Sequence, residues 1–189
     1  MIDPLRLASR IEAEPTERLH LGSGSVALPG WINIDNQPYP GVDRVVDVTQ
    51  GLPFRDARFI FAEHFIEHIR YEDARVLLAE CRRVLRDGGV LRLSTPNLDW
   101  VWASHYRTVL TPDLEVLACF AMNRAFRGWG HQFLWNLATL SAALHDAGFK
   151  RVVRCEYGQS EHAELRGLEQ HETNEDYEGH SHILIVEAS

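Results

Sequence analysis

Short apolar runs recur along the first half of the chain and are separated by turns and by one long amphipathic stretch. Such runs are typical of strands that are buried in a parallel sheet. The strands that they predict lie at residues 19–21, 31–34, 42–48, 59–62 and 90–94. Residues 71–86 have an apolar side and a charged side, which predicts a helix that ends at the Asp87-Gly88-Gly89 turn. Strands and helices in this order favour an α/β fold.

The second half of the chain has a less regular pattern. Residues 98–136 are rich in aromatic residues and histidines and predict two short helical stretches, broken near Pro112 and at residues 128–130. A further helix is predicted at residues 136–148, and the last two strands at residues 151–157 and 182–187. The polar loop between these strands, residues 158–180, has a length that is typical of a lid, a partner-binding segment or a disordered loop. Its acids and histidines could also hold a divalent ion, although no ligand spacing is diagnostic.

The N-terminal segment, residues 1–15, predicts one helix, which Asp3 can cap and Pro15 ends. A chain of 189 residues, of which 45% are hydrophobic, is large enough for one domain with a real core. No internal repeat or linker is visible, so we expect a single domain over residues 1–189.

The formal net charge of −8 argues against a nucleic-acid partner and against binding to an anionic membrane surface. No apolar segment approaches the roughly 20 residues that span a bilayer, and the N-terminus lacks the pattern of a signal peptide. We therefore expect a cytoplasmic protein. Cys81, Cys119 and Cys155 follow no ligand spacing, which favours reduced, packed thiols.

The stretch of residues 19–35 carries the first candidate chemistry. Gly22-Ser23-Gly24 follows a predicted strand and lets the backbone turn tightly against a ligand. Asp35 ends the next strand, where its carboxylate can accept hydrogen bonds from the two hydroxyls of a ribose. These features predict a nucleoside-binding α/β fold.

The length of this connection distinguishes between two candidate cofactors that contain adenosine. Gly22, Gly24 and Ala27 fit the dinucleotide pattern G-x-G-x-x-G/A, which uses the N-terminus of a helix to face a pyrophosphate. The connection at residues 22–30 is shorter than the roughly 10 to 12 residues that a helical crossover needs. S-adenosylmethionine contains no phosphate, so the short connection favours it over NAD.

Four motifs then occur in order along residues 18–97. They are LHLGSG with WINID, Asp47 with Leu52-Pro53-Phe54, AEHFIEHI at residues 62–69, and RVLRDGGVLRLSTPN at residues 83–97. With these motifs the chain resembles the class I S-adenosylmethionine-dependent methyltransferases, and within them a compact branch similar to methyltransferase type 11. The resemblance implies a Rossmann-like, doubly wound and mostly parallel seven-stranded sheet with helices on both faces. It also implies an antiparallel last strand and a helical substrate cap, residues 98–136, inserted after the fifth strand.

The resemblance implies S-adenosylmethionine as the cofactor and residues that bind it. Asp47 matches an acid that accepts a hydrogen bond from the adenine amino group, and a loop-capping aspartate is the alternative. The candidate cofactor-binding residues are Gly22, Ser23, Gly24, Asp35, Asn36, Asp47, Val48 and Glu63. His20 stands where the broader family often has an acid for the methionine amino group, and Ser25 replaces a third glycine.

The segment His64-x-x-Glu67-His68 spells H-x-x-E-H, the motif of the inverted zinc peptidases. It directly follows a predicted strand rather than opening a long helix, and the sequence marks no third zinc ligand elsewhere. We therefore expect no metal. In the resembling family Glu67-His68 matches a frequent pair after the fourth strand, so His64 and His68 are candidates for proton handling, with capping and packing as the alternative.

The aromatic residues of the 98–136 segment suit a wall around a sugar ring, a planar acceptor or a sulfonium, and a small satellite core is the alternative. His131 in this segment is the preferred candidate for a general base. A neutral imidazole can take a proton from a hydroxyl or an amine as the methyl group moves.

These observations predict a methyltransferase that moves a methyl group from S-adenosylmethionine to an oxygen or nitrogen of a small molecule or glycan. One alternative is a non-catalytic protein that binds a nucleoside or a partner on a degenerate methyltransferase fold. A second alternative is NAD-dependent reduction.

Overall fold

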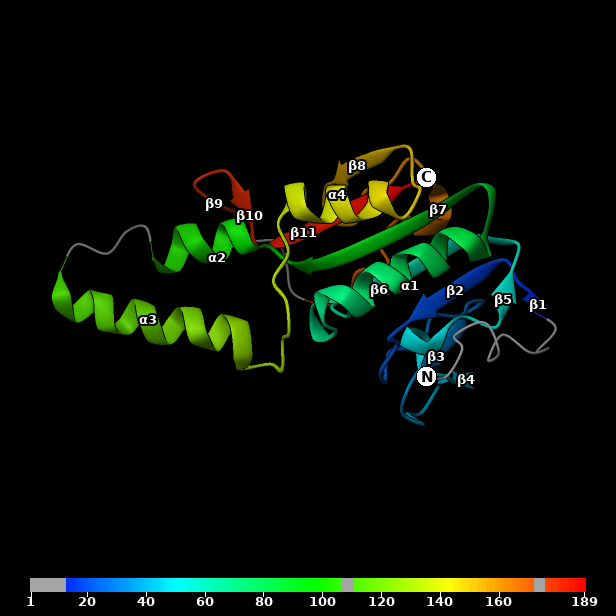
Figure 1. Cartoon of the computed structure of the whole chain (residues 1–189), viewed down its shortest axis with the longest axis horizontal. Coiled ribbons are helices and arrows are strands. Elements are labelled where there is room, and N and C mark those ends of the chain that lie inside the picture. The colour runs from blue at the N-terminus through cyan, green and yellow to red at the C-terminus, as the bar shows by residue number, and fades with distance from the viewer. Residues whose placement is uncertain (1–12, 107–110, 172–175) are drawn as a thin grey trace, which may run out of the picture.

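The structure is a computed structural model that describes residues 13–106, 111–171 and 176–189. A central sheet carries helices against one of its faces, and two further helices extend from one end (Figure 1). Most of the N-terminal helix predicted over residues 1–15 falls on residues 1–12, which lie outside the described residues, and its predicted end is instead a short strand, β1 (Glu14–Pro15).

The sheet has seven strands in the order β4-β3-β2-β6-β7-β11-β8. They are β2 (Arg18–Leu21), β3 (Ile32–Asp35), β4 (Arg44–Val45), β6 (Ala57–Glu63), β7 (Leu85–Pro96), β8 (Val152–Cys155) and β11 (Ile183–Ala188). β11 runs antiparallel to both of its neighbours, and the other neighbouring pairs are parallel. The predicted mostly parallel α/β fold with an antiparallel last strand is thereby confirmed.

The chain runs outward from β2 to β4 and then returns to β6 on the other side of β2. A parallel sheet opens a crevice at the carboxyl ends of its strands where the strand order reverses in this way. The topology therefore places a ligand crevice beyond the ends of β2, β3 and β6.

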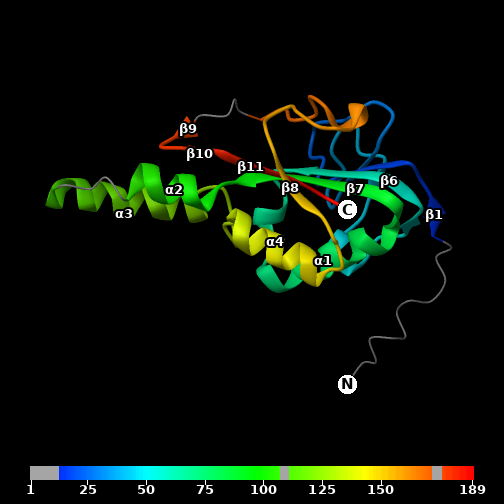
Figure 2. The same cartoon turned by 90° about the horizontal axis from the view of Figure 1, so that it is seen from above.

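Helices α1 (Tyr71–Val84) and α4 (Leu137–Asp146) lie together on one face of the sheet (Figure 2). Their buried residues, such as Leu78 and Leu144, share the main core with Ile60 of β6 and Leu91 of β7. Asn136 caps α4 by accepting a hydrogen bond from the Thr139 N–H at 3.0 Å. This face is the larger hydrophobic core of the protein.

The opposite face of the sheet is covered by loops in the described residues. Phe59 and Phe61 of β6 pack there against Leu28 and Trp31 from the β2–β3 connection and against Leu165. Leu165 ends a short 3₁₀ turn, η4 (Ala163–Leu165). Among the described residues, α1 and α4 lie on one face of the sheet, and the β2–β3 connection on the other face is too short to contain a helix.

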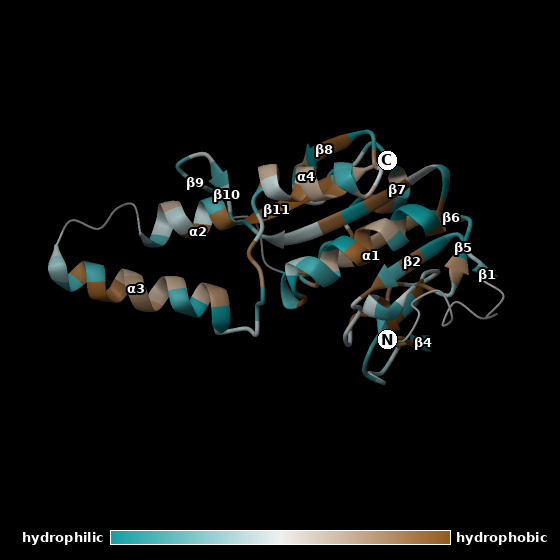
Figure 3. Cartoon of the chain, viewed as in Figure 1, coloured by the Kyte–Doolittle hydropathy of each residue, from teal (hydrophilic) through white to brown (hydrophobic). Residues whose placement is uncertain are grey.

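Helices α2 (Leu98–His105) and α3 (Pro112–Arg127) follow β7 and confirm the two predicted helical stretches. They project beyond the end of the sheet (Figure 1). α3 mixes hydrophobic and hydrophilic residues around its surface (Figure 3), and its Leu117 and Phe120 are 64% and 72% exposed. This helix therefore adds little to the main core.

Several short elements complete the fold. β1 (Glu14–Pro15) pairs in parallel with β5 (Phe54–Arg55), and β9 (Asp176–Tyr177) pairs antiparallel with β10 (His180–Ser181). The 3₁₀ turns η2 (Val48–Gln50) and η3 (Ile66–His68) follow β4 and β6. Within the described residues, no helix has the length and apolar character needed to cross a bilayer.

The third strand is shorter than predicted, with Arg44–Val45 in place of residues 42–48. Asp43 uses its carboxylate to accept a hydrogen bond from the Asn33 N–H at 2.8 Å, and Asp47 caps η2 by accepting one from the Thr49 N–H at 3.0 Å. The Asp43 carboxylate thus takes a backbone donor of β3 before the strand, and the chain turns into η2 at Asp47 after it, although the Val46 N–H still donates to the Asp35 carbonyl at 2.9 Å.

A buried cation ties the covering loop to the sheet. The guanidinium of Arg92, in the middle of β7, is fully buried; its Nε lies 2.7 Å from Glu169 Oε1 and its Nη1 lies 2.6 Å from Glu187 Oε1. Nη1 also donates to the Gln159 carbonyl at 3.0 Å. Arg92 thus joins two strands of the sheet to both ends of the loop at residues 159–169.

We expect Arg92→Met to lower the free energy of unfolding by about 3–5 kcal/mol, because it leaves two buried carboxylates without their cation. Urea denaturation measures the change. The control is Arg58→Met, which removes an exposed pair with Glu164 of the same loop, 3.0 Å apart, and should cost less than about 1 kcal/mol. Equal losses in the two variants would contradict the structural role of Arg92.

Candidate active site

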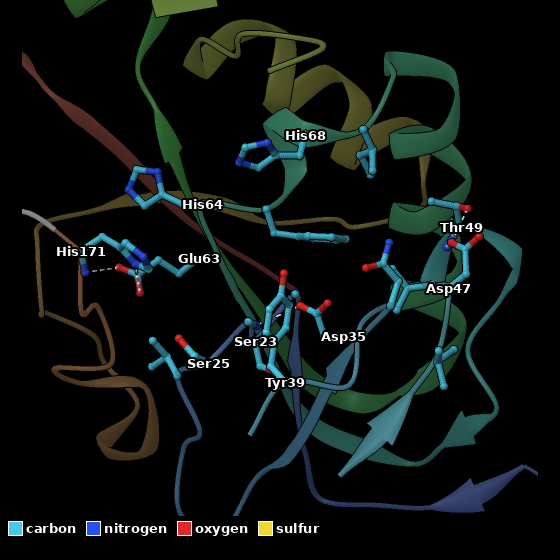
Figure 4. Close-up of a pocket in the computed structure, with 18 residues that line it drawn as sticks. Ser23, Ser25, Asp35, Tyr39, Asp47, Thr49, Glu63, His64, His68 and His171 are labelled. Atoms are coloured by element: carbon cyan, nitrogen blue, oxygen red, sulfur yellow. Dashed lines mark hydrogen bonds and ion pairs between the residues drawn. The ribbon is translucent and has the colours of Figure 1, made fainter. Parts of the chain in front are cut away.

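A cavity of about 580 Å³ lies at the carboxyl ends of β2, β3, β4 and β6 (Figure 4). This volume is in the range of small-molecule sites, roughly 300–1,000 Å³. All of the predicted cofactor-binding residues line it, namely Gly22, Ser23, Gly24, Asp35, Asn36, Asp47, Val48 and Glu63. His64 and His68 line it as well.

The glycine turn forms the floor of the cavity. Gly22 has φ +64°, and a Cβ built on it would lie 2.3 Å from Phe65 Cδ2, so no other residue fits there without a shift. The Gly24 N–H donates to Asp35 Oδ2 at 2.9 Å. Asp35 therefore holds the turn while its carboxylate lines the cavity.

The connection behind this turn contains no helix, as its length predicts. The side chain of Asn33 replaces the missing helical hydrogen bonds: its Oδ1 accepts from the Leu28 N–H at 2.8 Å, and its Nδ2 donates to the Trp31 carbonyl at 3.2 Å. The site accordingly has no helix N-terminus at this turn for a pyrophosphate, which agrees with the preference for a phosphate-free ligand.

Asp47 lines the cavity as the cap of η2. Its Oδ1 accepts hydrogen bonds from the Thr49 N–H at 3.0 Å and from the Thr49 hydroxyl at 2.6 Å. The loop-capping alternative is therefore observed. Capping uses one carboxylate oxygen only, so Oδ2 can still accept a bond from a ligand.

Glu63, at the end of β6, holds a segment that is distant in the sequence. Its buried carboxylate accepts hydrogen bonds from the Gln170 N–H at 3.0 Å and the His171 N–H at 3.1 Å, and it lies 3.1 Å from His171 Nδ1. The His171 side chain thereby becomes part of the cavity wall (Figure 4).

His64 follows Glu63 with φ +45°, a left-handed conformation that is uncommon for a residue other than glycine. Its Nδ1 lies 3.2 Å from Glu67 Oε1, and its ring centroid lies 5.2 Å from that of His171. The other oxygen of Glu67 accepts a hydrogen bond from the Thr95 hydroxyl at 3.0 Å. Glu67 and Thr95 thus fix the orientation of the His64 imidazole at the cavity.

His131, the third histidine predicted from the sequence, is not among the residues that line the cavity. Its ring lies edge-on to that of His68, with centroids 5.0 Å apart, and its Nδ1 bonds to the Ala125 carbonyl at 2.7 Å. His131 therefore contacts the cavity only indirectly, through the His68 ring that lines it.

His20 lies beneath the glycine turn and is buried. Its Nδ1 donates to Asn33 Oδ1 at 3.0 Å, and its ring stacks on Phe61 with centroids 5.3 Å apart. Burial lowers the pKa of His20 below its ordinary value of 6.5. This residue supports the turn from below rather than lining the cavity.

The sheet order, the glycine turn and the acid at the end of β3 define a nucleoside-binding α/β protein of the methyltransferase type. Residues 3–154 match the sequence model of a family described as a methyltransferase domain, and the chain belongs to this family. The predicted class, class I S-adenosylmethionine-dependent methyltransferases, and the predicted cofactor are thereby confirmed. No curated protein matches the sequence.

Solved structures share the fold at low sequence identity. A SAM-dependent methyltransferase from Archaeoglobus fulgidus superposes with a TM-score of 0.58 at 15% identity, over 97% of this chain and 90% of that chain. DhpI in complex with SAH gives a TM-score of 0.54 at 14% identity, over 98% of this chain and 80% of that chain. The CurJ carbon methyltransferase gives 0.50 at 15% identity, over 96% of this chain and 50% of that chain.

Sequence reasoning missed several residues of the cavity wall. Phe65, Tyr39 and His171 line the cavity. Phe65 lies inside the motif at residues 62–69 that the sequence marks, and its position directly after His64 was the available signal. His171 comes from a polar loop whose position depends on Glu63 and Arg92, which no local pattern reveals.

The lowered pKa of His20 predicts a pH dependence of stability. The folded protein binds this proton less readily than the unfolded chain, so the contribution of His20 is complete above pH 6.5 and is lost as the pH falls through the folded-state pKa. We expect His20→Gln to reduce the loss in free energy of unfolding between about pH 7.5 and about pH 5, measured by urea denaturation. An identical loss in the two proteins would show that His20 does not contribute.

Proposed function

We propose that this protein transfers a methyl group from S-adenosylmethionine to an oxygen or nitrogen of a small molecule or sugar. The observation that carries the proposal is the position of Asp35, whose carboxylate accepts the Gly24 N–H at 2.9 Å and lines the cavity. An acid that binds the ribose hydroxyls is expected at this position, the end of the second parallel strand. When bound, S-adenosylmethionine supplies a methyl group activated by a sulfonium.

The cavity has two chemically different ends, which support an orientation for the cofactor (Figure 4). Asp47 and Thr49 lie at one end, and Glu63, His64 and His171 lie toward the other. Asp47 Oδ2 makes no hydrogen bond within the described part of the chain and can accept one from an adenine amino group. We assign the adenine to Asp47 and Val48, the ribose to Asp35 and Asn36, and the remainder to the glycine turn and the histidine end.

We assign Glu63 an indirect part in cofactor binding. Its carboxylate already accepts the Gln170 and His171 N–H groups, so it holds the wall of the cavity in place. The glycine turn and this wall together confine the space in which the two reactants meet. Most of the rate enhancement is expected from holding them in contact and in line.

His64 is the side chain that we propose to accept the proton of the acceptor. It lines the cavity, and Glu67 Oε1, 3.2 Å from its Nδ1, orients the imidazole there. His68 is the second candidate, and His131 can act only through His68 in this geometry. No described residue of the aromatic segment at residues 98–136 lines the cavity. We therefore propose that this segment contacts the acceptor outside the cavity, near His131.

We expect Asp35→Asn to weaken binding of S-adenosylmethionine about 10- to 100-fold, because hydrogen bonds to a charged group contribute about 1.5–3 kcal/mol. Isothermal titration calorimetry measures the affinity. Asp43→Asn is the matched control: Asp43 bonds to Asn33 at 2.8 Å and does not line the cavity, so binding should be unchanged. Unchanged affinity in Asp35→Asn would mean that the ribose lies elsewhere, and binding of NADH instead would support the reductase alternative.

We expect His64→Asn to lower kcat about 10²- to 10⁴-fold and to change the affinity for S-adenosylmethionine much less, because the other groups that line the cavity remain. Asparagine tolerates the left-handed backbone at this position but cannot take the proton. The acceptor is first found by following S-adenosylhomocysteine formation with a panel of hydroxyl, amine and carbon acceptors, and kcat is then compared.

His171→Asn serves as the control for this variant because it removes a second imidazole from the same cavity. A similar loss of kcat in both variants would reject His64 as the base. Transfer only to carbon acceptors would replace the oxygen or nitrogen assignment, and cofactor binding without transfer to any acceptor would favour the non-catalytic alternative.

A further inference from the structure

Three side chains with metal-binding atoms converge beside the histidine end of the cavity. One ligand atom from each of Glu67, His68 and His131 lies within 4.8 Å of the other two. Two imidazoles and one carboxylate form a ligand set that suits Zn²⁺ and other divalent transition metals. The sequence pattern had suggested His64 and His68 as the pair of imidazoles, but the structure instead pairs His68 with a histidine from a distant segment.

The backbone clamps the two segments that carry these ligands. The Gln132 N–H donates to the Glu67 carbonyl at 2.7 Å, and the Phe133 N–H donates to the same oxygen at 3.2 Å. The Gln132 side chain also donates to the His68 carbonyl at 2.7 Å. Gln132 and Phe133, the two residues that follow His131, are both hydrogen-bonded to the turn at residues 67–68. The ligand atoms are therefore held near one another without a metal.

The hydrogen bond of His131 selects the tautomer that a metal needs. A carbonyl oxygen can only accept, so His131 Nδ1 carries the proton in its 2.7 Å bond to Ala125. Nε2 then has a free lone pair. Metal-binding histidines commonly donate their other ring N–H to a carbonyl in this way, which fixes the ring orientation.

Glu67 provides the negative charge of the cluster. Its side chain is fully buried, and within the described residues its carboxylate is paired with His64 and Thr95 but with no lysine or arginine. Buried carboxylates are usually paired with a cation or coordinate a metal. Each oxygen retains a lone pair beyond these two contacts, so the contacts orient the carboxylate without preventing coordination.

We propose that Glu67, His68 and His131 bind one divalent transition metal ion, for which Zn²⁺ fits the ligand set best. Three protein ligands leave a coordination position for water or substrate. His64 and His68 both line the cavity, so an ion held by His68 would lie beside the end that contains His64. If the proposed methyl transfer is correct, the ion would orient an oxygen or nitrogen of the acceptor there and favour its deprotonation.

The test is a titration of untagged, chelator-treated full-length protein with Zn²⁺ alone, followed by calorimetry. We expect one equivalent to bind, and His131→Ala to weaken binding by about 100-fold or more, since even the loss of an outer-shell partner costs about 10- to 100-fold. His145→Ala is the matched control, because His145 Nδ1 also bonds to a carbonyl, that of Phe149, at 3.0 Å. Binding in this variant should equal that of the unaltered protein.

A second readout separates loss of ligation from loss of folding. His68→Ala and His131→Ala should each abolish the visible absorption that Co²⁺ gives in the unaltered protein, while both variants retain their far-UV circular dichroism. Absence of stoichiometric Zn²⁺ binding to the unaltered protein would overturn the proposal. Equal binding by the His131→Ala and His145→Ala variants would overturn it as well.

The cofactor proposal is tested independently of this one. Asp35→Asn should retain full Zn²⁺ affinity, because Asp35 lies at the glycine turn and belongs to no part of the cluster. His131→Ala should retain its affinity for S-adenosylmethionine measured without metal. Failure of Zn²⁺ binding therefore leaves the methyltransferase proposal standing, and failure of cofactor binding leaves the metal site standing.

Discussion

The connection between β2 and β3 imposes the main constraint on this structure. It joins neighbouring parallel strands without a helix, so its backbone groups need other partners. Asn33 and Asp35 provide them from β3: Asn33 binds the Leu28 N–H, and Asp35 binds the Gly24 N–H. Residues two apart on a strand point to the same face, so one strand supports both the connection and the turn that forms the cavity floor.

Because this connection has no helix, one face of the sheet lacks a helical layer in the described residues. A loop from the C-terminal part of the chain covers this face. The loop contributes Leu165 to the apolar cluster around Phe59 and Phe61. Its polar groups bind two charged side chains of the sheet: Glu169 pairs with Arg92 of β7, and the Gln170 N–H donates to Glu63 of β6. The Arg92 contact is buried and the Glu63 contacts are partly buried, and together they place His171 in the wall of the cavity.

Glu67 organises the histidine end in a similar way. It is buried in the turn after β6, where its side chain orients His64 and its carbonyl binds the segment that carries His131. His68 lies between this segment and the cavity. The end with Asp47 and the end with His64 therefore belong to one cavity, and an acid in hydrogen bonds, Asp47 or Glu67, lies at each.

The strands along the chain, the helix that begins at residue 71 and the tight turn at residues 22–24 follow from the sequence, because apolar periodicity, a glycine turn and loop length are local properties. The same local reasoning located Asp35, since an acid at the end of a strand must lie at the carboxyl edge of the sheet. Only the tertiary structure decided that Asp47 caps a 3₁₀ turn, that His171 lines the cavity and that His131 contacts His68. Those positions depend on contacts between residues far apart in the chain, and such contacts are determined by packing and buried charge rather than by any pattern within one segment.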